Sequence, residues 1–298
     1  MPKLDLNIKD VFSKIYLSVK THYDNNGLNV DKLIREDILN SKKNKSDDLI
    51  YKRLVFSIHN ANWKAVSQET FWRNNSKNYE KAFKNYNANY VSKLKVEDLL
   101  DKGLINSRKK LQYCINAAKF IVEIKKYSED GVISFFEKYA YEGSSVYDRW
   151  ALVNIIAHSI DGIATALACD FLKETGFLNY GKPDVHIKRI FERIGLIDYF
   201  EDITVYSNED FFIFRILDIL SQKTNKTLFE IDKILWLFAT GFNNTNGKAI
   251  GGICKDKPDC NLCNIRTVCK YYQHDIYGKA VTTSHKQNVS VNCKRVRQ

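Results

Sequence analysis

Two neighbouring stretches decide the fold: IDGIATALA at residues 160–168 and KPDVHIKR at residues 182–189. Apolar residues recur with helical spacing before and after the glycine of the first stretch, as expected for helices that each bury one face. In the second stretch, Pro183 and Asp184 stand directly before another helical pattern. An aspartate at a helix start commonly accepts hydrogen bonds from the first free backbone amides. The sequence therefore predicts two helices joined by a short turn, followed by a helix that Asp184 begins.

Helical periodicity recurs along the whole chain, and only three prolines interrupt it. Over Arg108–Ile124, for example, the apolar residues fall on one helix face. Strand-like alternation is short and rare, and Ile203–Tyr206 is its best example. The pattern predicts an all-α fold. Further helices are expected over Trp150–His158, Ile163–Leu172, His186–Ile194 and Leu228–Thr240.

The composition is that of a globular chain with a strong basic surplus. The 298 residues are 44% hydrophobic and 27% charged, and the net charge is +11. Such a surplus favours a polyanionic partner, because each neutralised phosphate releases condensed counterions. No apolar run approaches the roughly 18–20 residues that cross a bilayer, and residues 1–8 contain no apolar signal core. We expect a cytoplasmic monomer with no membrane partner.

Four of the seven cysteines lie within sixteen residues, with the spacing Cys-x5-Cys-x2-Cys-x5-Cys. Thiolates are soft ligands that hold zinc or iron–sulfur clusters. Zinc ribbons usually separate two Cys-x2-Cys pairs, whereas this chain has one such pair between two short arms. The spacing favours a compact [4Fe–4S] cluster, with zinc as the less favoured occupant and unliganded cysteines as the least favoured interpretation. The predicted ligands are Cys254, Cys260, Cys263 and Cys269.

This spacing resembles the C-terminal loop of endonuclease III and the related adenine glycosylases, which belong to the helix-hairpin-helix superfamily of base-excision DNA glycosylases. The first arm of the family loop has six residues, and here it has five. Trp236–Gly241 resembles the family helix that leads to the cluster, and Tyr271 follows the last cysteine at the usual place. The resemblance implies a structural loop that presents basic residues to DNA phosphates. These would be Lys255, Lys257, Arg266 and Lys270.

The two opening stretches resemble the hairpin and the catalytic segment of the same superfamily. Its members carry a Gly-x-Gly hairpin between two helices and, about twenty residues on, an aspartate in an Asp-x-His-Ile-x-Arg setting. Gly162 matches the first hairpin glycine, Ala164 replaces the second, and Asp184 matches the aspartate. The resemblance implies that the backbone at Gly162 and Ala164 binds a DNA phosphate. Arg189 would bind a phosphate or the backbone of the cysteine segment, and His186 would be a structural hydrogen-bonding group.

The resemblance also implies a reaction. Cleavage of an N-glycosidic bond develops oxocarbenium charge on the sugar, and a nearby carboxylate at Asp184 would stabilise that charge and orient a water. An ordinary helix cap is the alternative for Asp184. Bifunctional members carry a hairpin lysine that forms a Schiff base with the sugar, and the register places Ala166 there. Alanine cannot form an imine, so we expect a monofunctional enzyme that leaves an abasic site.

Residues 55–64, VFSIHNANWK, resemble the family segment whose side chain fills the gap left by a flipped base. An ordinary helix end is the alternative. The polar candidates for this DNA contact are His59, Asn60 and Asn62. The aromatic side chains of Trp63 and Trp72 are candidates for the wall of the base pocket, as in the 3-methyladenine glycosylase I branch, and core packing is the alternative for both.

The domain organisation implied by the resemblance has two helical lobes with double-stranded DNA in the cleft between them. A six-helix barrel with the hairpin would span residues 45–178. Residues 1–44 and 179–273 would form the iron–sulfur lobe, and residues 274–298 a basic, flexible tail.

The function implied is a monofunctional DNA glycosylase acting on a damaged, mismatched or modified base. The sequence leaves the base open among oxidised pyrimidines, alkylated purines, deaminated or mismatched bases, and bulky modified cytosines of phage DNA, which would indicate phage defence. The rival hypothesis is a non-catalytic DNA-binding protein with a redox-sensing iron–sulfur cluster.

Overall fold

The structure is a computed structural model that describes residues 7–43, 46–60, 65–201, 208–243 and 249–277. These residues are mostly helical, so the all-α prediction is confirmed in its coarse form. In chain order the helices are α1 (Ile8–Asp24), α2 (Val30–Ser41), α3 (Asp47–Asn60), α4 (Ala65–Ala82), α5 (Ala88–Val91), α6 (Arg108–Lys125), α7 (Val132–Ala140), α8 (Val146–Ser159), α9 (Thr165–Glu174), α10 (Val185–Ile194), α11 (Leu196–Glu201), α12 (Glu209–Thr224) and α13 (Leu228–Thr240). Short 3₁₀ turns span Val96–Leu99 and Cys260–Leu262, and a π-helical turn spans Tyr272–Tyr277.

Two short strands form the β structure of the described residues. β1 (Gly241–Asn243) pairs antiparallel with β2 (Ala249–Gly251), with Gly241 opposite Gly251. The sequence did not predict this pair, because three residues are too few to show an alternating pattern. The strand expected at Ile203–Tyr206 lies outside the described residues. At Gly241 the backbone has a φ of 97°, and a Cβ there would lie 2.2 Å from the carbonyl oxygen of Ile250. Glycine is therefore required where α13 turns into the strand pair.

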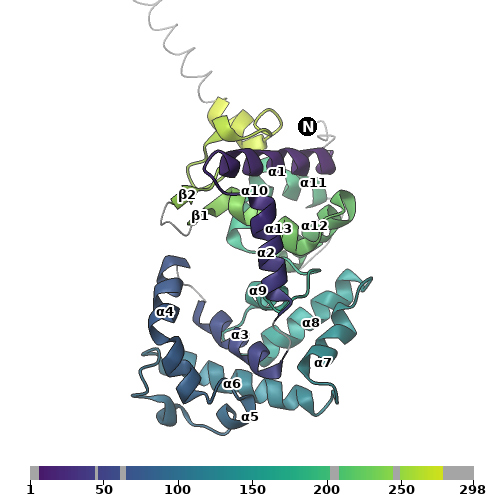
Figure 1. Cartoon of the computed structure of the whole chain (residues 1–298). Helices are drawn as coiled ribbons and strands as arrows, with labels where there is room; N and C mark the ends of the chain where they lie inside the picture. Colours follow the sequence, from purple (N-terminus) through teal and green to yellow (C-terminus); the bar gives the residue numbers. More distant parts are fainter. Residues whose placement is uncertain (1–6, 44–45, 61–64, 202–207, 244–248, 278–298) are drawn as a thin grey trace, which may run out of the picture.

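The helices gather in two groups in Figure 1. One group contains α1 and α10–α13, and the other contains α3–α8, with α2 running from the first toward the second. The first group joins chain segments that lie far apart in sequence: α1 packs against α12 and α13. The Tyr23 hydroxyl donates to the carbonyl of Leu237, and the backbone amide of Asn264 donates to Ser18 Oγ. The exact domain bounds given above stay a prediction.

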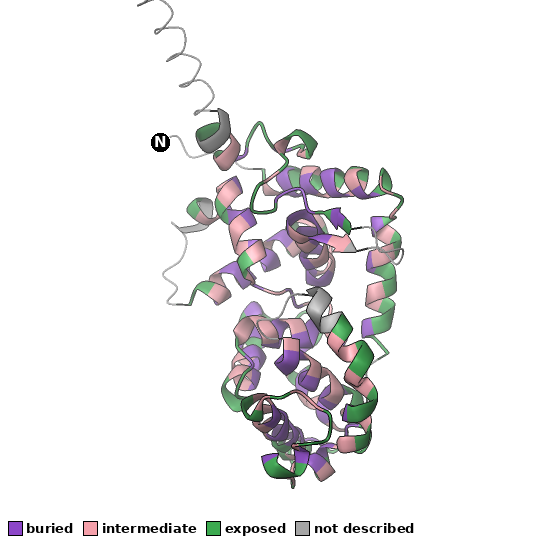
Figure 2. Cartoon of the chain, turned by 90° about the vertical axis from the view of Figure 1, so that its left-hand side faces the viewer, coloured by how far each residue is buried: buried purple, intermediate pink, exposed green. Residues whose placement is uncertain are grey.

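The core of the molecule follows the helical patterns, with buried faces turned toward neighbouring helices and exposed faces outward (Figure 2). In α10 the buried residues are Ile187, Ile190, Phe191 and Ile194, which is one stripe of a helix. Burying such a stripe removes apolar surface from water and fixes how the helix lies. Gly195, in the left-handed conformation, ends the helix as a C-terminal cap. Within the described ranges, no helix joins the length and the apolar character that crossing a bilayer requires.

Candidate active site and cysteine loop

The turn between α8 and α9 is a tight hairpin. The amide of Ile163 donates to the carbonyl of Ile160, 3.1 Å away, and both of these side chains are buried. Gly162 has a φ of 83°, and a Cβ on it would lie 2.3 Å from the ring of Tyr113. Ala164 instead has a φ of −83° and a ψ of 170°, an extended conformation that any residue adopts. The alanine that replaces the second hairpin glycine therefore introduces no backbone strain.

The hairpin also leaves the start of α9 without a side-chain cap. Ala164 occupies the N-cap position of α9, and its side chain makes no capping hydrogen bond. The first amides of a helix need an outside acceptor, and a phosphate oxygen meets that need well. Gly162 and Ala164 are both exposed. The geometry therefore suits the predicted phosphate contact of this turn.

Asp184 is the N-cap of α10, as the sequence predicts. Its Oδ1 accepts hydrogen bonds from the amides of His186, at 2.9 Å, and Ile187, at 3.1 Å. The amide of Asp184 donates to the carbonyl of Lys182, which closes a tight turn around Pro183. Within the described residues, Asp184 Oδ2 makes no hydrogen bond. The helix thus fixes one carboxylate oxygen and leaves the other for a substrate or a water.

Asp184 lines a cavity of about 850 Å³ where α9, α10 and α13 meet. Its lining is mostly charged, and Trp236 and Phe229 supply the large apolar surfaces. His186 and Arg189 line the same cavity, together with Lys255 and Asp256 from the cysteine loop. The cavity therefore brings together the predicted catalytic aspartate, the hairpin helix and the cysteine segment.

A buried ion cluster forms one wall of this cavity, and the sequence did not predict it. Lys173 Nζ lies 2.5 Å from Asp232 Oδ2 and 3.1 Å from Asp170 Oδ1. Burial alone would lower the pKa of Lys173, but the carboxylates of Asp232 and Asp170 outweigh it and hold this pKa well above its ordinary value. Lys173 is therefore a charged structural partner. Asp170 and Lys173 lie three residues apart on α9, but no local motif links them to Asp232 on α13.

Ala166 lies in the first turn of α9 and is half-buried. The sequence of α9, TALACDFLKE, contains one lysine, Lys173, and that lysine is held by the ion cluster. The hairpin position predicted to carry the imine-forming lysine in bifunctional relatives is thus occupied by a methyl group.

The placement of His59 corrects its prediction as a DNA contact. Its side chain is fully buried. His59 Nδ1 donates to the carbonyl of Val55, and the Tyr79 hydroxyl donates to Nε2 across 2.5 Å. Burial lowers the pKa of His59 to about 4, so the imidazole is neutral in the core. A buried, fully hydrogen-bonded ring cannot fill a gap in a DNA stack.

The neighbours of His59 divide between core and surface. Asn60, the last residue of α3, is partly exposed, and its Oδ1 accepts a 3.4 Å hydrogen bond from Trp72 Nε1. Trp72 packs on Phe56 with ring centroids 4.0 Å apart, which favours core packing over a base-pocket wall. Asn62 and Trp63 lie outside the described residues.

The four predicted cysteine ligands line one small cavity, together with Phe238, Ile253 and Ile265. All four are free thiols. Burial raises the pKa of Cys263 to about 12, and the neighbouring cysteines add to the shift. Among the described residues, no set of three or more His, Cys, Asp or Glu side chains is arranged to hold a single metal ion. Four soft sulfur donors thus line one small, apolar cavity.

Arg193 fixes the start of the cysteine loop to α10. Its guanidinium donates to the carbonyls of Cys254, Lys255 and Asp256 at 3.2, 2.7 and 3.0 Å. Arg193 also lies 4.8 Å from the ring centroid of Tyr271. The sequence did not single out Arg193 for this role, although its place one turn after Arg189 is a signal. The family's backbone contact expected of Arg189 is thus made by Arg193.

Arg189 pairs instead with the exposed carboxylate of Asp256. Its second amino group lies 3.3 Å from His186 Nδ1. Lys255, Lys257 and Arg266 are exposed on the cysteine loop, and Lys270 is paired with Asp198. The basic residues predicted to meet phosphates are therefore on the surface, and two of those predicted from the family already have acidic partners.

The hairpin, the capped aspartate and the cleft define a helix-hairpin-helix base-excision fold. Residues 31–226 match the family described as 8-oxoguanine DNA glycosylase, Ogg-HhH, and the chain belongs to this family of DNA glycosylases. A comparison with curated proteins gives no match.

The chain is similar to two solved structures. The 8-oxoguanine DNA glycosylase of Thermotoga maritima has 16% sequence identity and a TM-score of 0.51, covering 80% of this chain and 99% of that one. The Methanocaldococcus jannaschii 8-oxoguanine glycosylase/lyase, solved with DNA, has 21% identity and a TM-score of 0.49, covering 74% and 95%.

Proposed function

We propose that the chain is a monofunctional DNA N-glycosylase that hydrolyses the bond between the sugar and a flipped base. The observation that carries this proposal is the placement of Asp184, held at the start of α10 on the cavity that the hairpin helix α9 also lines. A phosphate bound at the exposed turn of Gly162 and Ala164 would bring the sugar toward this carboxylate.

Asp184 supplies the chemistry in this proposal. As the glycosidic bond breaks, positive charge develops on the sugar, and a fixed carboxylate stabilises it without reorganising. The helix amides hold Oδ1, so Oδ2 is available to face the sugar or to orient the attacking water. The base leaves with the bonding electrons, water adds to the sugar carbon, and an abasic site results.

Ala166 supports the absence of a lyase step. Schiff-base formation requires a neutral amine near the sugar carbon. The hairpin provides a methyl group there, and Lys173 is charged by its two aspartates. The Methanocaldococcus jannaschii protein is named a glycosylase/lyase. A chain without lyase activity would differ from it in this step.

The family description makes 8-oxoguanine the base to test first. Trp236 offers an aromatic surface in the cavity for stacking. The other damaged, mismatched and phage-modified bases remain alternatives that the same assay separates.

We also propose that Cys254, Cys260, Cys263 and Cys269 hold a [4Fe–4S] cluster. The shared cavity supports a common ligand for the four thiols, and their spacing, one Cys-x2-Cys pair between two short arms, favours a cluster over zinc. The cluster would staple the loop that presents Lys255, Lys257 and Arg266 to DNA, within an iron–sulfur lobe facing the hairpin barrel. Of the candidates for the side chain that fills the gap left by the flipped base, Asn60 is the one that the structure describes and that is partly exposed.

The test uses a panel of duplexes that each carry one altered base, with 8-oxoguanine first, and modified phage DNA. We expect base release, strand breakage only after alkali, and no adduct trapped by borohydride. An efficient adduct in wild type that Lys182→Ala abolishes would show a relocated lyase lysine. Binding without base release on every substrate would instead favour the non-catalytic DNA-binding protein.

A further inference from the structure

The segment from Asn179 to Asp184 connects α9 to α10 and delivers the carboxylate to the cavity. Its residues Tyr180, Gly181 and Pro183 are buried, and a Cβ on Gly181 would lie 3.2 Å from Leu217 and 3.3 Å from the carbonyl of Leu228. Such a segment has little freedom of its own. The groups that hold it therefore set where Asp184 lies.

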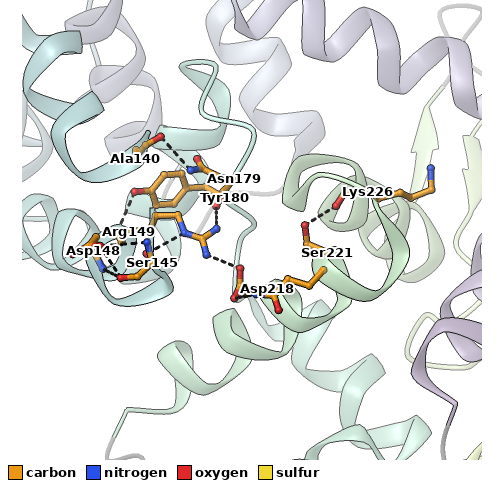
Figure 3. Close-up of polar contacts among 10 residues, drawn as sticks. Ala140, Ser145, Asp148, Arg149, Asn179, Tyr180, Asp218, Ser221 and Lys226 are labelled. Carbon is orange, nitrogen blue, oxygen red and sulfur yellow. Dashed lines mark hydrogen bonds and ion pairs between the residues drawn. The ribbon is translucent and has the colours of Figure 1, made fainter. Parts of the chain in front are cut away.

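A buried pair holds the segment on the side away from the cavity. The Arg149 guanidinium on α8 lies between Asn179 and Asp218 in Figure 3, donating to the Asn179 carbonyl at 3.1 Å and to Asp218 Oδ1 at 2.5 Å. The Tyr180 hydroxyl donates to the Arg149 carbonyl. This contact lies at the far end of the segment from Asp184.

A second buried pair holds the segment at Lys182, two residues before Asp184. Asp232 Oδ1 accepts the Lys182 amide at 2.8 Å, and Asp232 Oδ2 binds Lys173 Nζ at 2.5 Å. The carbonyl of the same Lys182 accepts the Asp184 amide at 2.9 Å. One carboxylate on α13 thus connects the hairpin helix, through Lys173, to the turn that ends in Asp184.

We propose that Asp232 is a positioning residue for Asp184, acting through its hydrogen bond to the Lys182 amide. The inference rests on the proposed function of Asp184. When the hairpin binds a phosphate, the α9–Asp232–Lys182 connection fixes the distance from that phosphate to the carboxylate. A misplacement of about 1 Å at a reacting group costs on the order of 10²-fold in rate.

The two pairs have matched burial, which gives the test its control. The side chains of Lys173 and Asp232 are 9% and 5% exposed, and those of Arg149 and Asp218 are 7% each. Breaking either pair is expected to lower stability, because a charge is left buried without its partner. The Asp232 pair alone meets the turn of Asp184.

The decisive variants remove both charges of the pair and differ in one acceptor. Lys173→Met/Asp232→Asn keeps an oxygen for the Lys182 amide, and Lys173→Met/Asp232→Leu has nearly the same shape without it. Both variants take Lys173 away from Asp170, whose carboxylate is 29% exposed and keeps Lys182 Nζ at 3.8 Å. This loss is the same in both variants, so both are expected to fold and the comparison isolates the one acceptor. Asp218→Asn is the control for lost stability at the opposite pair.

The readouts are the single-turnover rate of base release with excess enzyme, the DNA dissociation constant, and amide exchange of the peptide around Lys182. We expect the Asn variant to stay within a few-fold of wild type. The Leu variant should lose about 10²-fold in rate with DNA affinity nearly unchanged, and its Lys182 amide should exchange faster. Asp218→Asn should lower the melting temperature but keep the rate.

Equal rates in the Asn and Leu variants would overturn the positioning role, whether both are fast or both slow. An equal loss in Asp218→Asn would overturn it too. If wild type releases no base from any substrate, the proposed function fails, and amide exchange still decides whether Asp232 holds the turn.

Discussion

Helix α10 begins in the cavity and ends against the cysteine loop, and its two ends use similar side chains differently. At the first end, Asp184 keeps one oxygen without a hydrogen bond among the described residues. In the middle of the helix, Arg189 binds the exposed carboxylate of Asp256. At the other end, Arg193 saturates three carbonyls of the loop and lies beside Cys254 Sγ, 3.5 Å away. The first end has groups that a substrate can engage, and the second has groups already committed to the fold.

Within the ten residues of α10, the groups proposed for catalysis are therefore separate from the groups that hold the cysteine loop in place. A variant at the beginning of α10 should change what happens to DNA while the protein stays folded. A variant at the end should change the loop and the cluster proposed for it, while the chemistry of each intact molecule persists. The following predictions test that separation.

Asp184→Asn should produce the largest change. Base release should fall by at least about 10³-fold, since the charge opposite the developing oxocarbenium is lost. The fold and DNA binding should persist, and binding could tighten as repulsion from phosphates is relieved. Single-turnover assays and melting curves measure both. Asp148→Asn, at the start of α8, is the control and should keep the rate. Full activity in Asp184→Asn would remove the catalytic assignment.

Cys260→Ser should lower iron content and soluble yield strongly, because a cluster that staples the loop contributes folding free energy. Wild type should be brown, with about four irons per chain. Base release per correctly folded molecule should change less than in Asp184→Asn. Cys169→Ser, a buried thiol outside the loop, should keep its iron. Stoichiometric zinc without iron in anaerobically prepared wild type would contradict the cluster.

Arg189→Ala and Arg193→Ala place the same change in the middle and near the end of α10, one turn apart. DNA affinity should fall steeply with salt in wild type, and Arg189→Ala should reduce the log–log slope by about 0.9, one phosphate contact. Its iron content should stay normal. Arg193→Ala should lose iron instead, because it frees the loop from α10. If both variants change DNA affinity alone, or both change iron content alone, the proposed division of roles along α10 is wrong.

Removal of the chain after Gly278 should have the smallest effect. The removed segment is basic, so DNA affinity should fall by a few-fold at low salt and less at high salt. Turnover at saturating DNA should persist. Fluorescence anisotropy over a salt series measures the change, and a salt-independent difference would show that the segment acts by another means.

The sequence predicted the features that local rules determine. The limits of α13 agree with the expected Leu228–Thr240, and α10 begins after the predicted cap at Asp184. Helical periodicity and capping act within a few residues, so they can be read from one stretch. The converging cysteines also follow from short spacing.

Features that depend on distant partners were not predictable. The residues around His59 have the polar composition of a helix end. The buried position of His59 depends on its hydrogen bond with Tyr79, twenty residues later, which the local sequence does not show. The pair of Lys173 and Asp232 spans fifty-nine residues, and neither side chain is unusual in its own helix. Such contacts depend on how helices pack, which periodicity leaves open.

The two hairpin positions carry a lesson about substitution. Gly162 has a positive φ, and a Cβ on it would lie 2.3 Å from the ring of Tyr113. Any side chain there would therefore meet both backbone strain and a collision. Ala164 has neither constraint. In evolution the first position should therefore accept glycine alone, while the second drifts among small residues without loss of the turn. A search pattern that demands both glycines will overlook chains of this kind, and one that requires the first glycine and the distant aspartate will find them.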